Sequence, residues 1–188
     1  MVSRRLDTPP EPAAAPDYAA PVEGWRLWLV VEHAGALRLA SIVYDVVWPP
    51  GEPLVAECVG LRRSSGPWRQ RERPAHTAPE PSCRCGIHAA ADVLRFAAYL
   101  EGSYPGDGAV ARVVGRIALW GTVVEGGRGW RASRAYPARL CVPRLPGRPA
   151  AEADAIAEGL AVYRVPVDVV FGSAPAALLR SLVAAEAA

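Results

Sequence analysis

The chain has 188 residues and a net charge of +2. This length favours a single domain, and the near-neutral charge excludes strong bulk attraction to nucleic acid, though not a local basic patch. The sequence contains no run of about 18 apolar residues, so it predicts no membrane-spanning helix. The first twenty residues lack the apolar block of a signal peptide, and a cytoplasmic location is therefore expected.

The first part of the chain reads as a tail followed by strands. Segment 1–22 carries five prolines among alanines and charged residues, which predicts a disordered tail and a single domain over 23–188. Residues 24–32 alternate as a strand, with Trp25, Leu27, Leu29 and Val31 expected on one face. Residues 37–48 are apolar on both faces, which predicts a central strand. A short third strand is expected over 54–61.

A loop and a helix are expected next. The segment 61–86 is rich in Arg and Pro and predicts a long loop, which is usually functional or tied down in a compact domain. The alanine-rich stretch 87–101 predicts a helix that ends at Gly102. Such a helix would present backbone N–H groups to the cysteines that precede it and would favour their thiolate forms.

The second half predicts a hairpin and two helices. A glycine-rich turn at 125–129 separates two strand patterns, and Gly121 is expected to mark a bulge or bend. The remaining expected elements are strands over 110–124, 130–142 and 165–171, and helices over 151–163 and 174–187. The predicted fold class is α+β, with a mostly antiparallel curved sheet or small open barrel and two or three flanking helices.

The residues with the clearest chemistry form a histidine and cysteine cluster. His76, Cys83, Cys85 and His88 follow one another as H-x6-C-x-C-x2-H. Zinc takes a tetrahedral set of thiolates and imidazoles, and a metal can order a loop that has no secondary structure of its own. The glycine after Cys85 would let the chain turn tightly around an ion. The pattern predicts a structural zinc site in this loop.

The fourth ligand has two candidates. One set takes His88 with His76, Cys83 and Cys85. The other replaces His88 by Cys58, from the strand that enters the same loop, and we favour this Cys3His set. The same residues also support an enzyme hypothesis, with zinc or a thiolate such as Cys85 as the reactive group. Cys141 is expected in the core and His33 in solvent.

Two regions are predicted to contact a partner. The Arg-rich segment, residues 62–73, carries five arginines, one glutamate and a tryptophan, a local charge of +4. Guanidinium groups bind phosphate, and indole rings stack on bases. The second region is the hairpin strand over 130–142. The predicted contact residues are Arg62, Arg63, Trp68, Arg69, Arg71, Arg73, Trp130, Arg131 and Arg134.

The segment HTAPEPSCRCGIHA, residues 76–89, resembles a stretch in proteins of high-GC bacteria to which no activity is assigned. In those proteins a similar H…C-x-C-G segment follows a W-x-P-G motif, here at 48–51. An aromatic hairpin also follows it, here from Leu119 to Ala132, so that the resemblance covers roughly 24–142. The resemblance implies His76, Cys83 and Cys85 as metal ligands. It argues against His88 as a ligand, because the corresponding position in those proteins is often aromatic.

Three functions follow from these patterns. The first is a non-catalytic, zinc-stabilised binding or adaptor module that contacts nucleic acid or a protein partner through the Arg-rich segment and the aromatic hairpin. The second is a small cytoplasmic enzyme that uses the Cys/His zinc or a thiolate. The third is a structural assembly component in which the cluster only stabilises the fold. None of the three involves a membrane.

Overall fold

The computed structural model describes residues 20–43, 46–58, 76–101, 108–147 and 149–186. The Arg-rich segment and residues 1–19 of the predicted disordered tail lie outside these ranges. The last residues of that tail, 20–22, are described, and the first strand begins at Val22. Within the described residues, no helix is both long and apolar enough to cross a lipid bilayer.

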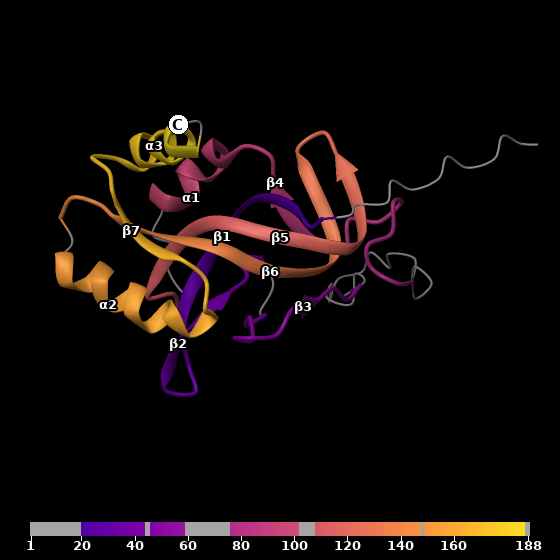
Figure 1. Cartoon of the computed structure of the whole chain (residues 1–188), viewed down its shortest axis with the longest axis horizontal. Helices are drawn as coiled ribbons and strands as arrows, with labels where there is room; N and C mark the ends of the chain where they lie inside the picture. Colours follow the sequence, from indigo (N-terminus) through magenta and orange to yellow (C-terminus); the bar gives the residue numbers. More distant parts are fainter. Residues whose placement is uncertain (1–19, 44–45, 59–75, 102–107, 148, 187–188) are drawn as a thin grey trace, which may run out of the picture.

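One mixed sheet forms the centre of the molecule (Figure 1). Every described strand pair is antiparallel except β6 with β7, which confirms the predicted α+β class with a mostly antiparallel sheet. The strands are β1 (Val22–His33), β2 (Ala36–Ala40), β3 (Leu54–Val55), β4 (Ile87–Ala90), β5 (Ala111–Gly126), β6 (Gly129–Arg144) and β7 (Val167–Phe171).

Four of these strands close an uneven ring. β1 pairs with β5, β5 with β6, β6 with the short β4, and β4 returns to β1 through a single pair of residues, Trp25 and Ala90. The interior of the ring holds the main core, in which Trp28 and Trp48 pack edge to face at 5.8 Å between ring centres. Burial of such large apolar side chains supplies most of the favourable free energy of folding.

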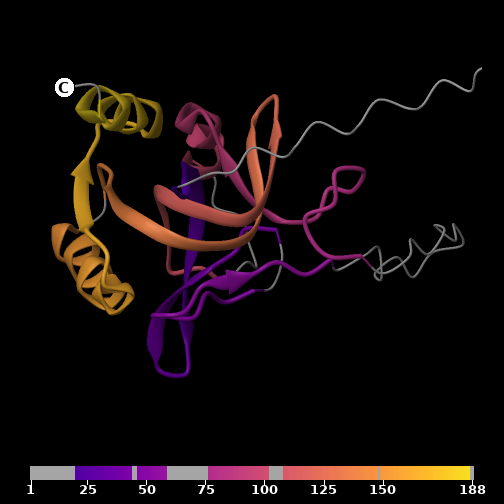
Figure 2. The same ribbon diagram turned by 45° about the vertical axis from the view of Figure 1, so that its right-hand side comes forward.

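The helices cover the ring from two sides (Figure 2). α3 (Pro175–Glu186) packs on α1 (Ala97–Glu101) and on the outer face of the ring, where Trp25 and Cys141 are buried. α2 (Ala150–Leu160) lies on the other side of β7 and joins the main core through Ile156 and Leu160. Cys141 is therefore a core residue, as predicted. Val183 on α3 is 44% exposed.

Tyr163 fixes α2 to the ring. It ends the 3-10 helix η2 (Ala161–Tyr163), and its hydroxyl accepts a hydrogen bond from the Leu39 backbone N–H at 2.8 Å. The same hydroxyl donates to the Trp48 carbonyl oxygen at 2.7 Å. All three residues are buried, so these bonds satisfy groups that have no access to water.

The predicted helix over 87–101 is wrong in its first half. Ile87–Ala90 form β4, where Ile87 and Ala89 are buried and His88 is exposed. Only after the η1 turn (Val93–Phe96), which the Asp92 side chain caps, does α1 begin. The alanine content favours a helix locally, but pairing with both β1 and β6 outweighs that preference.

The predicted central strand over 37–48 is also wrong. β2 ends at Ala40, pairs with β1 and lies at one end of the strand order; on its other side Ala40 forms only an isolated bridge to Val47. The chain then reverses, with a hydrogen bond of 2.9 Å from Ser41 N to Val46 O, and Trp48 returns beside Leu39. The segment is apolar on both faces because its two halves lie in different surroundings. Trp48 fills the ring interior, whereas Val43 is 80% exposed.

The expected irregularity at Gly121 is a β-bulge. Gly121 and Thr122 on β5 together face Ser133 on β6, and the register shifts between Trp120 and Val123. The φ of Gly121 is +75°, and a Cβ there would lie 2.3 Å from Ser133 Oγ, so only glycine fits. On the facing strand β6, Arg134 is exposed and its neighbour Ala135 is buried, as the alternation of a strand requires.

Candidate metal centre

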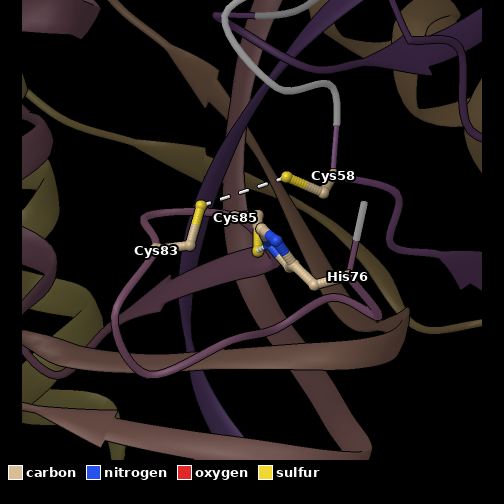
Figure 3. Close-up of side chains that lie close together, drawn as sticks. All are labelled: Cys58, His76, Cys83 and Cys85. Atoms are coloured by element: carbon tan, nitrogen blue, oxygen red, sulfur yellow. Dashed lines mark hydrogen bonds between the residues drawn. The ribbon is translucent and has the colours of Figure 1, made fainter. Parts of the chain in front are cut away.

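Cys58, His76, Cys83 and Cys85 meet in space, which is the ligand set that the sequence favoured (Figure 3). One candidate ligand atom from each of the four lies within 4.8 Å of all the others. The Cys58 and Cys83 sulfurs are 3.9 Å apart, and His76 Nε2 is 3.2 Å from Cys85 Sγ. Sulfurs on a tetrahedral zinc ion are about 3.8 Å apart. The four residues are therefore close enough to hold a metal ion.

The ligands come from two stretches of chain that the sheet brings together. Cys58 lies three residues beyond β3, which pairs with β6 through Val55 and Arg134. Cys83 and Cys85 lie just before β4, which pairs with the same strand β6. A turn closed by the 2.9 Å hydrogen bond from Cys83 N to Glu80 O precedes them. β6 is thus the common support of the centre.

Arg131 on β6 holds the loop that carries two of the ligands. Its Nη1 donates to the carbonyl oxygens of Cys83 at 2.6 Å and Cys85 at 2.8 Å, with a longer contact of 3.4 Å to that of Glu80. No carboxylate among the described residues pairs with Arg131. Its positive charge therefore faces the ligand loop, where three thiolates and a divalent cation would leave one net negative charge.

Gly86 lets the chain leave the cluster. Its φ is +114°, a conformation that side chains disfavour, and a Cβ there would lie 3.0 Å from the Pro79 Cβ and 3.2 Å from the Arg131 Cβ. The sequence predicted a tight turn at this glycine, and the structure confirms it. The turn leads into β4 rather than into a helix.

The cysteines of the cluster differ in acidity. The Cys85 backbone N–H donates to Cys83 Sγ and, with further bonds from the cluster, lowers the pKa of Cys83 to about 6. Burial raises the pKa of Cys85, and the neighbouring Cys83 thiolate adds to that rise. The predicted contribution from a helix N-terminus is absent because β4 follows Gly86. Without metal, Cys83 therefore loses its proton at a lower pH than Cys85.

In metal-free protein, we expect Cys83 to react with iodoacetamide along a pH profile with its midpoint near pH 6, because the thiolate is the nucleophile. An ordinary thiol has its midpoint at about pH 8.5. Peptide mass spectrometry after short exposures at a series of pH values would give the profile for each cysteine. A Cys83 midpoint above pH 8 would contradict the hydrogen bond from Cys85.

The other predicted site residues lie elsewhere. His88 is exposed on β4, and its Nε2 lies 3.0 Å from the Arg84 carbonyl oxygen, so it is not part of the four-residue cluster. His33 is exposed, as expected. Trp130 is half-buried against the main core, whereas Arg134 is exposed. The six predicted contact residues of the Arg-rich segment, Arg62, Arg63, Trp68, Arg69, Arg71 and Arg73, lie outside the described residues.

Sequence reasoning placed Arg131 among the partner contacts and missed its bonds to the ligand loop. No local pattern signals those bonds, because Arg131 and Cys83 are 48 positions apart and meet only through the pairing of β4 with β6.

Comparisons with protein-family models, with curated proteins and with solved structures found no match to this chain.

Proposed function

We propose that this protein is a non-catalytic binding module, stabilised by one zinc ion, that contacts nucleic acid through its Arg-rich segment. The observation that carries the proposal is the convergence of Cys58, His76, Cys83 and Cys85. Three thiolates and one imidazole form a common closed zinc set, which leaves no position for a substrate. Such a set favours a structural role for the metal over a catalytic one.

The position of the ligands links the metal to the proposed contact surface. Cys58 directly precedes segment 59–75 and His76 directly follows it, and this segment contains the Arg-rich residues 62–73. An ion bound by both residues would fix the two ends of the segment at one point. Fixing the ends lowers the conformational entropy that the segment loses on binding. Metal and partner affinity are therefore coupled in this proposal.

The hairpin supplies a smaller part of the proposed surface. Arg134 is exposed on β6 next to Val55 of β3, three residues from Cys58. Its guanidinium is thus available beside the point where segment 59–75 begins. Trp130 contributes a partly exposed ring further along the same strand. Arg131 belongs to the support of the metal centre, since its Nη1 already bonds to the ligand loop.

We expect the purified zinc-bound chain to bind a fluorescent single-stranded oligonucleotide with an affinity that falls as salt rises. Replacing Arg62, Arg63, Arg69, Arg71 and Arg73 by glutamine should reduce the slope of log affinity against log salt by up to about 3.5, because each phosphate contact on a single strand contributes about 0.7. Removing the metal with a chelator should weaken binding while the arginines remain. Fluorescence anisotropy across a salt series measures both effects.

The control variant replaces Arg38, Arg95, Arg128, Arg164 and Arg180 by glutamine, which removes the same charge from other parts of the chain. This variant should keep the salt dependence of the unmodified chain. Equal losses in the two variants would show only a bulk charge effect and would contradict the role of the Arg-rich segment. Absence of nucleic-acid binding in the zinc-bound chain would favour a protein partner.

A further inference from the structure

Arg26 lies at the interior wall of the ring, where charged side chains are rare. It is on β1, and the alternate positions Trp28 and Val30 on the same strand face are fully buried in the main core. The guanidinium carbon of Arg26 lies 5.0 Å from the ring centre of Trp48 and 6.0 Å from that of Trp28. A positive charge therefore lies against two buried indole rings.

This charge has no counter-ion among the described residues. The side chain of Arg26 donates to two neutral acceptors, the His88 carbonyl oxygen at 2.6 Å and Ser41 Oγ at 3.3 Å. Burial lowers the pKa of Arg26 to about 10, so the group is still protonated at neutral pH. Uncompensated buried charge is costly and is normally paired.

The same place has more hydrogen-bond donors than acceptors. Arg26 Nε and Trp28 Nε1 are buried and find no hydrogen-bond partner in the part of the chain that the structure describes. Ser41 Oγ already accepts from Arg26 and from Trp48 Nε1, the latter at 3.1 Å. Its own O–H is a third donor, for which the described residues provide no acceptor. A buried donor that stays unpaired loses its hydrogen bonds to water without replacement, which destabilises the fold.

We propose that the Arg26 cluster, defined as Arg26, Trp28, Ser41 and Trp48, binds a small oxyanion, a carboxylate or a phosphate. An oxyanion supplies several acceptor lone pairs and the missing negative charge at once, and the planar guanidinium matches it with two parallel bonds. A water molecule would pair with the donors but would leave the charge uncompensated. Arg26 as a whole keeps partial solvent contact, which gives the anion a route of entry.

The test follows the indole N–H signal of Trp28 by NMR during separate titrations with sodium phosphate, sodium acetate and sodium chloride at matched ionic strength. Trp28→Phe identifies this signal among those of the six tryptophans. We expect a saturable shift with phosphate or acetate and none with chloride. The affinity should fall by about tenfold or more in Arg26→Gln, which loses the charge-assisted bonds.

The matched control is Arg116→Gln. Arg116 also lies over an indole ring, at 4.3 Å from the ring centre of Trp25, but its charge is paired with Glu186 at 2.7 Å. Replacing it should leave the titration of Trp28 unchanged. If Arg26→Gln does not fold, Ser41→Ala, which removes the third donor, takes its place.

The outcomes separate the alternatives. A response to phosphate alone identifies the ligand class as phosphate, and a response to acetate extends it to carboxylates. A shift that does not saturate, or that is the same in Arg26→Gln, overturns the proposal. None of these results depends on the metal proposed at Cys58, so the two proposals fail separately.

Discussion

Replacing His76 by alanine is expected to release the bound zinc, whereas the same replacement at His88 should leave the zinc in place. Only His76 lies in the four-residue cluster. His88 is exposed and contacts the backbone of Arg84. The two histidines are 12 positions apart in one short segment, so the pair separates ligand loss from any general effect of removing an imidazole there.

The loss of zinc should also lower the free energy of unfolding. A ligand that binds only the folded state stabilises it by about 4 kcal/mol when its free concentration is a thousand times its Kd. His76→Ala should lose most of this stabilisation, and His88→Ala should change stability by no more than about 0.5 kcal/mol. Elemental analysis of the purified variants gives the zinc content, and chemical denaturation with and without a chelator gives the stability.

Three results would contradict the zinc proposal. One is unmodified protein that carries no metal after expression with zinc present and does not take it up afterwards. Another is equal zinc loss in His76→Ala and His88→Ala. The third is a metal that binds but adds no stability, since this would assign the cluster a role other than support of the fold.

Replacing Arg131 by methionine is expected to weaken zinc binding by about ten- to a hundredfold, the range found when groups that orient metal ligands are removed. Methionine keeps much of the aliphatic stem but removes the bonds to the carbonyl oxygens of Cys83 and Cys85. It also removes the positive charge beside a centre that is expected to be net negative. Competition with a zinc-binding dye measures the affinity.

The control for this variant is Arg134→Met, three residues along the same strand. Arg134 is exposed and makes no bond to the ligand loop, so zinc affinity should stay unchanged. Arg131→Lys, which keeps the charge, should lose less affinity than Arg131→Met. The cobalt-substituted forms provide a second measurement, because a displaced ligand loop alters the visible spectrum of the metal. Wild-type affinity in Arg131→Met would show that the loop holds its shape without these bonds.

The ligand set could be predicted from the sequence because its residue types are scarce. The chain has four cysteines and three histidines, and most of them lie in or just before one loop. Cys58 was favoured over His88 because its strand enters the same loop, and the cluster in the structure agrees. The hydrogen bonds of Arg131 to the ligand loop could not be predicted, because no spacing of residues in the sequence indicates an arginine that donates to distant backbone carbonyls.

Strand order and strand faces were harder to predict than strand positions. The hairpin of β5 and β6 and its bulge at Gly121 followed from local turn signals. Residues Ile87–Ala90 were predicted as the start of a helix because alanine favours helix. They form β4 instead, because they pair with β1 and β6. The alternation of the first strand predicts which residues share a face, but not that both faces are buried, with Trp25 outside the ring and Trp28 inside it.

By itself, the sequence determined the α+β class, the hairpin, the two C-terminal helices and the cysteine and histidine cluster that could hold a metal ion. These depend on turn residues, on periodicity and on rare side chains, all of which act over short stretches of chain. The closure of the ring, the edge position of β2, the support of the ligand loop by Arg131 and the place of Arg26 against the core were decided only by the tertiary structure. Each depends on which distant strands pair, and pairing energy is shared between segments that the sequence keeps apart.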